Sequence, residues 1–163
     1  MTDRDSPSEW IEEVIACIRT RDFKRADEGY PIALGKLLEF EKHVTAEELG
    51  WRASLSTSAH LRFAYAEACA AVGAPERGLT KLRELAHALA GFRNSDDYFL
   101  IARGMVTLES FCALAVQLYP GTASNPMWPK LLAELQSKLD DDGRSLIHEL
   151  RQKLGQLSPV TPR

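Results

Sequence analysis

Residues 96–119 read DDYFLIARGMVTLESFCALAVQLY, the longest helical stretch that the sequence predicts. The apolar side chains of this stretch recur on nearly every face of a helix: Tyr98, Phe99, Ile101, Met105, Val106, Leu108, Phe111, Cys112, Leu114, Ala115 and Leu118. A helix that is apolar on all sides in a water-soluble chain belongs in a core that other helices surround. The sequence therefore predicts an all-α fold around a central helix over 96–119.

Shorter amphipathic segments flank this stretch, with apolar residues at the three-and-four spacing of one helical face. Ser8 is placed to cap the first of them, which ends near Ile18. The next helix is expected to begin near Pro31, because proline lacks an amide donor and disfavours helical geometry in the residue before it.

The segments 60–72 and 76–90 are separated by Gly73-Ala74-Pro75 and are predicted to form a helical hairpin. After a loop at 120–129, two further amphipathic segments follow, and no segment shows the alternation of a half-buried strand. We expect a compact bundle of about six to eight helices in a single domain over 1–157, followed by a disordered tail at 158–163.

The composition places the chain among ordinary globular proteins, with 45% hydrophobic and 26% charged residues. Residues 1–50 carry 7 Lys and Arg against 12 Asp and Glu, so no basic stripe favours a nucleic-acid partner. No apolar run reaches the roughly 20 residues of a membrane span, and the first residues lack the layout of a signal peptide. Cys17, Cys69 and Cys112 lie among apolar neighbours, as buried thiols do. These features predict a cytoplasmic protein without a membrane or nucleic-acid partner.

Side chains with catalytic or metal-binding chemistry are scattered along the sequence. Glu84 and His87 are three residues apart, which is half of a di-iron helix motif, but the second copy is missing and a solvated helix face is predicted. The run Asp140–Asp142 lacks the alternate-position oxygens of a calcium loop. Each cysteine lies in an apolar helix with no adjacent base, where a thiol stays protonated. The sequence predicts no catalytic residue, no metal and no cofactor.

Two windows of the sequence, 10–33 and 62–85, resemble the tetratricopeptide repeat in the spacing of their small and large residues. In the first window the matching residues are Trp10, Val14 and Cys17, a turn at Arg21-Asp22-Phe23, and then Ala26, Tyr30 and Ala33. In the second window they are Tyr65, Ala66 and Cys69, a turn at Gly73-Ala74-Pro75, and then Gly78, Leu82 and Leu85. The copies depart from the family in lying 52 residues apart instead of 34, and no third copy occurs at 96–119.

The resemblance implies a binding groove lined by the first helix of each hairpin. Carried over by position, its residues are Ile11, Ile15, Ile18 and Arg19 on one helix, and His60, Phe63 and Glu67 on the other. Because these positions are mostly apolar, they favour contact with an amphipathic helix over the capture of a peptide carboxylate. The alternative is that the three isoleucines are simply core.

Two classes of function follow from these features. The first is a non-catalytic protein-binding module, such as a small bacterial adaptor, secretion chaperone or immunity-type protein, whose partner is another protein or peptide or a second copy in a homodimer. The second is an enzyme or small-ligand-binding bundle whose polar site is assembled from single residues on several helices.

Overall fold

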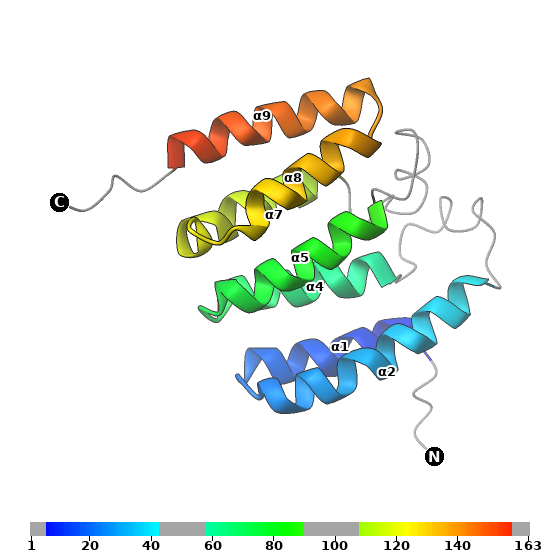
Figure 1. Cartoon of the computed structure of the whole chain (residues 1–163). Coiled ribbons are helices and arrows are strands. Elements are labelled where there is room, and N and C mark those ends of the chain that lie inside the picture. Colours follow the sequence, from blue (N-terminus) through cyan, green and yellow to red (C-terminus); the bar gives the residue numbers. More distant parts are fainter. Residues whose placement is uncertain (1–5, 43–57, 90–107, 158–163) are drawn as a thin grey trace, which may run out of the picture.

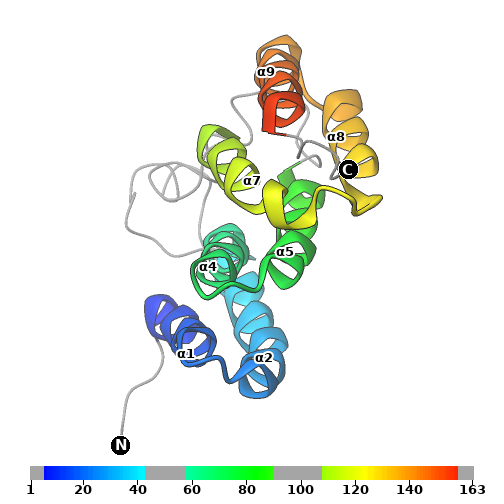
Figure 2. The ribbon, with the colours of Figure 1, turned by 90° about the vertical axis from the view of Figure 1, so that its left-hand side faces the viewer.

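The computed structural model describes residues 6–42, 58–89 and 108–157. Within these ranges the chain forms seven helices and no strand, which confirms the predicted all-α fold of six to eight helices. The helices are α1 (Pro7–Arg19), α2 (Phe23–Lys42), α4 (Ser58–Ala71), α5 (Pro75–Leu89), α7 (Leu108–Thr122), α8 (Met127–Lys138) and α9 (Asp141–Leu157). Figures 1 and 2 show them stacked in chain order, with α1 and α2 at one end and α9 at the other.

The first two hairpins turn in the same way, 52 residues apart. In each turn, one residue adopts a left-handed conformation, Arg21 with φ 60° and Gly73 with φ 78°. The amide of that residue donates to the carbonyl three residues back, and the next amide donates to the carbonyl five residues back, in the pattern of a Schellman motif. These bonds are Arg21 to Ile18, Asp22 to Cys17, Gly73 to Ala70 and Ala74 to Cys69. Residues that lie 52 positions apart in the sequence therefore occupy equivalent backbone positions in the two turns.

Helix α2 does not begin near Pro31, as predicted, but at Phe23, and it runs through the proline to Lys42. A proline inside a helix removes one hydrogen bond and crowds the carbonyl four residues before it. Here buried side chains lie on both sides of it: Ala26, Tyr30, Ala33 and Leu37. Packing against the neighbouring helices thus outweighs the local preference, and Pro31 itself stays exposed.

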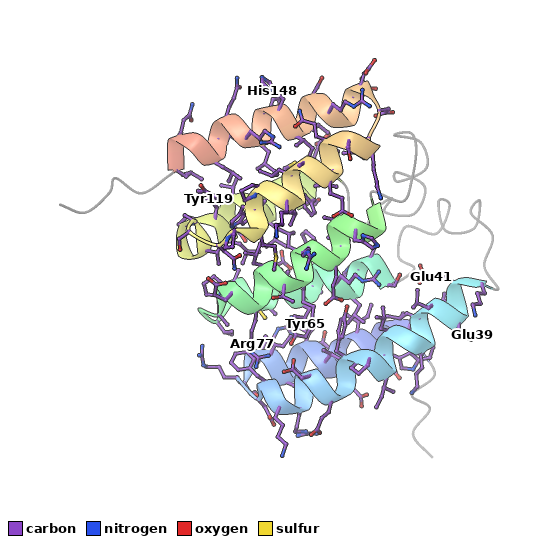
Figure 3. The ribbon with its side chains drawn as sticks, viewed as in Figure 1. Glu39, Glu41, Tyr65, Arg77, Tyr119 and His148 are labelled. Atoms are coloured by element: carbon purple, nitrogen blue, oxygen red, sulfur yellow. The ribbon has the colours of Figure 1, made fainter. Side chains whose placement is uncertain are left out.

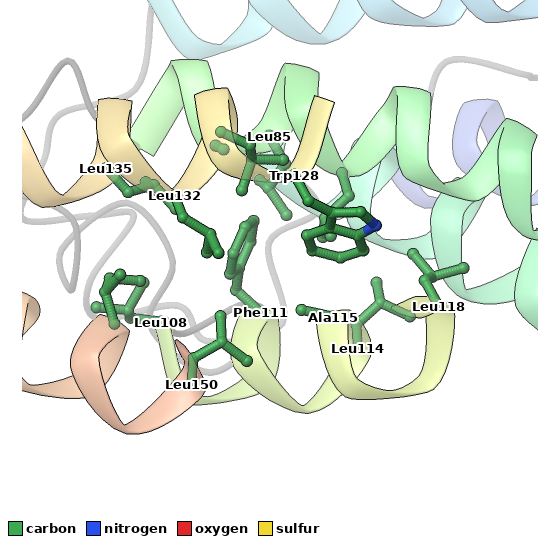
Figure 4. Close-up of a cluster of buried hydrophobic side chains, with 14 of the residues drawn as sticks. Leu85, Leu108, Phe111, Leu114, Ala115, Leu118, Trp128, Leu132, Leu135 and Leu150 are labelled. Atoms are coloured by element: carbon green, nitrogen blue, oxygen red, sulfur yellow. The ribbon is translucent and has the colours of Figure 1, made fainter. Parts of the chain in front are cut away.

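The buried side chains form two clusters that meet at α4. The smaller cluster contains residues of α1, α2 and α4, and the larger one contains residues of α4, α5, α7, α8 and α9. Helix α7 lies within the larger cluster, where it packs against α4, α5 and α9. Figure 4 shows its side chains Leu108, Phe111, Ala115 and Leu118 in this core.

The described part of the predicted central helix is helical, whereas residues 96–107, including Met105, lie outside the described residues, as does the predicted tail 158–163. Helix α7 also continues past Tyr119 to Thr122, so that the loop expected at 120–129 is reduced to residues 123–126. The buried indole of Trp128 donates from Nε1 to Thr122 Oγ1 at 2.9 Å, and this hydroxyl donates to the Leu118 carbonyl.

Among the described helices, none combines the length and apolarity required to cross a membrane.

Truncation of Leu108 tests the position of α7 in the core. Leu108→Ala is expected to lower the free energy of unfolding by about 2–5 kcal/mol, because a fully buried leucine leaves a cavity when it is shortened. Urea denaturation followed by circular dichroism measures this change. The matched control is Leu157→Ala on α9, where the side chain is 39% exposed and a change within about 0.5 kcal/mol is expected. A loss within error for Leu108→Ala would contradict this packing.

Gly78 tests the contact between α5 and its neighbours. A Cβ added there would lie 2.7 Å from Leu118 Cδ2 and 3.1 Å from the Ala66 carbonyl oxygen, so Gly78→Ala is expected to destabilise the protein by about 1–3 kcal/mol. Gly155→Ala is the control, because no atom lies within 4 Å of its added Cβ and alanine favours a helix interior by about 0.5–1 kcal/mol. Opposite signs for the two substitutions in urea denaturation are the expected result.

Candidate functional site

The three isoleucines predicted to line a binding groove are buried instead. Ile11 and Ile15 are 4% exposed and Ile18 is fully buried, all within the smaller core cluster. Helix α1 packs on α4 through this cluster, which includes Leu61, Tyr65 and Cys69 of α4. The prediction that these isoleucines form an open binding face is therefore corrected: they are packing residues, because α4 covers the row of α1 that carries them.

The other four predicted residues do not share a surface with them. Arg19 is exposed and forms an ion pair with Glu12 at 2.9 Å. His60 is half-buried, which lowers its pKa, and Phe63 is half-buried against the larger core cluster. Glu67 is exposed. The structure thus divides the seven residues between two cores and the solvent.

A polar layer joins α2 to α4 and α5. The Tyr65 hydroxyl donates to Asp27 Oδ1 at 2.7 Å, and Arg77 donates to both oxygens of that carboxylate, at 3.1 and 2.9 Å. The Tyr30 hydroxyl donates to Glu84 Oε1 at 2.6 Å. Figure 3 shows Tyr65 and Arg77 between the two hairpins. Each phenol that is buried by the stacking therefore has an acidic partner, as buried tyrosines require.

Cations and aromatic rings complete this layer. Lys81 Nζ lies 3.6 Å from the ring centroid of Tyr30 and 5.0 Å from that of Tyr65, and it forms an ion pair with Glu84 at 2.9 Å. Arg77 lies over the Phe23 ring at 4.5 Å. An ammonium or guanidinium group over an aromatic face is attracted by the ring quadrupole. The polar layer is therefore a network of hydrogen bonds, ion pairs and cation–π contacts that holds the hairpins together.

The ionisation of these groups follows from the same contacts. Burial tends to raise the pKa of Asp27, but the hydrogen bonds from Tyr65 and Arg77 and the charges of Arg77 and Lys81 outweigh it, and the pKa is lowered. Burial, together with the carboxylates of Glu84 and Asp27, raises the pKa of Tyr30 and Tyr65 respectively. At neutral pH both phenols are therefore neutral and the Asp27 carboxylate is ionised.

Glu84 and His87 are not simply a solvated helix face. Glu84 belongs to the polar layer, and His87 Nδ1 lies 2.8 Å from Glu134 Oε1 of α8, so that each links α5 to another helix. Among the described residues, no three His, Cys, Asp or Glu side chains converge as metal ligands. Burial raises the pKa of the Cys69 and Cys112 thiols to about 11, which keeps both protonated at neutral pH.

A groove of about 520 Å³ lies between α1 and α2, and its described lining comes from these two helices and from Thr20 and Asp22 in the turn between them. Its apolar lining includes Trp10, Cys17 and Ile32, and its charged lining includes Glu13 and Arg25. A second hollow of about 460 Å³ also borders Trp10 and extends along α2 to Phe40. Together these two hollows are called the outer groove below. The sequence did not indicate this groove, because Ile32 lies directly beside Pro31, where the second helix was expected to begin.

The 52-residue offset relates the outer groove to an interface inside the molecule. Its residues Glu13, Cys17, Arg25 and Ile32 are equivalent to Tyr65, Cys69, Arg77 and Glu84. Those four residues of the second hairpin face the first one, through the smaller core cluster and the polar layer. The outer groove is therefore the face on which a further helical layer would stack.

Asp27→Asn tests the polar layer. The neutral amide is expected to lower the free energy of unfolding by about 1 kcal/mol at pH 7, because it weakens the hydrogen bonds from Tyr65 and Arg77. Since the pKa of Asp27 is lowered on folding, the carboxylate stabilises the protein above 3.8, its ordinary pKa, and this stabilisation is lost as the pH falls through the folded value. The difference between the two proteins in urea denaturation is thus expected to shrink below that pH. A difference independent of pH would contradict this account.

Comparisons of this chain with models of known protein families, with curated proteins and with solved structures found no match. The likeness to tetratricopeptide repeats thus stays a resemblance of two sequence windows.

Proposed function

We propose that this chain is a non-catalytic protein-binding module, and that its docking face is the outer groove together with the exposed side of α2. The observation that carries the proposal is Ile32, which is 62% exposed at the border of the groove. Ile32 extends the apolar lining that Trp10 and Cys17 give to the groove. Contiguous apolar surface on a protein often marks a site of interaction with another protein.

The residues around Ile32 suit a protein partner. Trp10 borders both parts of the outer groove, and tryptophan is enriched among the residues that contribute most to protein interfaces. Lys36 Nζ lies 5.6 Å from the Trp10 ring centroid, which places a cation at the border of the apolar surface. An apolar centre with charges at its rim is the usual anatomy of a protein interface.

The internal equivalent of this face indicates the shape of the partner. On the second hairpin, the equivalent face holds the isoleucine row of α1, Ile11, Ile15 and Ile18. A helix that presents an apolar side chain therefore suits the outer groove, in the helix-in-groove mode of recognition. Adaptors, secretion chaperones and immunity proteins act by occupying a partner's surface, and the proposal covers these classes.

Ile32→Asp tests the proposed docking face. A carboxylate at the centre of an apolar contact is expected to weaken binding at least about tenfold, because its desolvation is not compensated. The partner is identified by affinity capture from the native host, and its Kd is then measured with purified proteins. Leu157→Asp, on the distant helix α9, is the matched control and is expected to leave the Kd unchanged.

Circular dichroism establishes that both variants remain folded. Equal affinity of the purified partner for wild type and Ile32→Asp would contradict the docking face. Absence of any stoichiometric partner, a second copy included, would contradict the protein-binding function.

A further inference from the structure

The outward side of α2 carries a row of residues that is symmetric about Ile32. Gly29 and Gly35 lie three positions before and after Ile32. Glu28 and Lys36, which carry opposite charges, lie four positions before and after it. Arg25 and Glu39, which also carry opposite charges, lie seven positions before and after it. The row is Arg25, Glu28, Gly29, Ile32, Gly35, Lys36 and Glu39. These spacings place the whole row on one side of the helix. All seven are exposed except Gly29, which is half-buried.

We propose that the partner on this face is a second copy of the chain, bound through α2 against α2 in antiparallel orientation with the two-fold axis at Ile32. This inference rests on the proposed function, because it names the partner of the same face. In a two-fold interface every contact between two different positions occurs twice. Arg25 then lies opposite Glu39 of the second copy, and Glu28 lies opposite Lys36 of the second copy.

The charges decide the orientation. A parallel pairing in the same register would place Arg25 against Arg25, Glu28 against Glu28 and Lys36 against Lys36, and like charges across an interface are unfavourable. The antiparallel pairing makes every one of these contacts attractive. Within one chain, Arg25 and Glu39 form surface ion pairs with Asp22 at 4.0 Å and Lys42 at 3.2 Å. Such exposed pairs are worth about 0–1 kcal/mol, so they do not prevent the new contacts.

The two glycines permit the close approach. Gly29 of one copy lies opposite Gly35 of the other, on either side of the isoleucine pair, where the absence of side chains lets the two backbones approach. Among the described residues, no atom lies within 4 Å of a Cβ built on Gly35, whereas a Cβ built on Gly29 would lie 3.6 Å from Val14 Cγ2 of α1. A glycine in an exposed helix interior costs about 0.5–1 kcal/mol relative to alanine. Close helix contact gives that destabilising residue a physical reason.

The surroundings of Ile32 fit this arrangement as well. Glu39 projects from the side of α2 opposite to Glu41, which bonds to Ser58 of α4 (Figure 3). The row of residues centred on Ile32 is thus turned away from the α4/α5 hairpin. Figures 1 and 2 place α2 at the end of the stack. The outer groove beside Ile32 provides apolar surface for the isoleucine of the second copy.

Sedimentation velocity of the full chain over about 1–100 μM tests the proposal. The expected mass for wild type is twice the 18.2 kDa of one chain. Ile32→Asp is expected to be monomeric, and Leu157→Asp is expected to remain dimeric. A monomeric wild type at about 100 μM, or a dimer that persists in Ile32→Asp, overturns the proposal.

Charge reversal tests the register. Arg25→Glu and Glu39→Arg each set like charges against one another at two symmetric places, and each is expected to raise the dimer Kd at least about tenfold. The double variant Arg25→Glu/Glu39→Arg restores both attractive pairs and is expected to return the Kd to within about threefold of wild type. Failure of the double variant to recover overturns the antiparallel pairing.

The result also separates this inference from the function on which it rests. A monomeric wild type whose purified heterologous partner is lost with Ile32→Asp contradicts the dimer and leaves the docking face in place. A dimer insensitive to Ile32→Asp, together with a partner insensitive to it, contradicts both.

Discussion

The packing of α1 on α4 is the contact on which the placement of the first hairpin, and of its outer face, depends. Helix α1 has 13 residues and buries one apolar row. The side chains of Ile11, Ile15 and Ile18 in this row pack against α4. Packing of this row on α4 fixes the rotation of α1 about its own axis. The tight turn at Arg21 then fixes the position of α2 relative to α1. As a result, Trp10 and Ile32 border the opposite side of the hairpin, at the end of the stack.

The two faces of this hairpin differ in how their polar groups are matched. Toward the second hairpin, Asp27 and Tyr30 meet complementary partners, and the polar layer specifies how the helices align. Hydrogen bonds of this kind add little net free energy, but they penalise any alignment that leaves a buried group unpaired. On the opposite face, Glu13 and Ile32 occupy the positions equivalent to Tyr65 and Glu84, so the same backbone presents a different chemistry. The contrast distinguishes an interface completed within the chain from the outer groove, which we propose as a docking face.

Most helices were predictable from the sequence, because their signals are local. The helices expected over 60–72 and 76–90 are observed as Ser58–Ala71 and Pro75–Leu89, separated by a turn whose glycine adopts the left-handed conformation. The start of α2 was missed, because the local rule against Pro31 gives no account of the buried Tyr30 and Ala33 beside it. The candidate site was missed for a related reason. Periodicity identifies an apolar row, but only the tertiary arrangement shows whether another helix covers it.

Within the described ranges, the two core clusters share a single helix, α4, and this has a consequence for how the protein loses its structure. Side chains of α1 and α2 contribute to the smaller cluster alone, while those of α5, α7, α8 and α9 contribute to the larger one. In stacked helical proteins, stability is a sum of layer terms and nearest-neighbour terms. Cooperativity between the two halves is therefore transmitted through one alanine-rich helix, through the polar layer between α2 and α5, and through the hydrogen bond from Arg21 to the Val72 carbonyl. The first hairpin is in this sense a separable folding unit, able to open while the remaining layers retain their core.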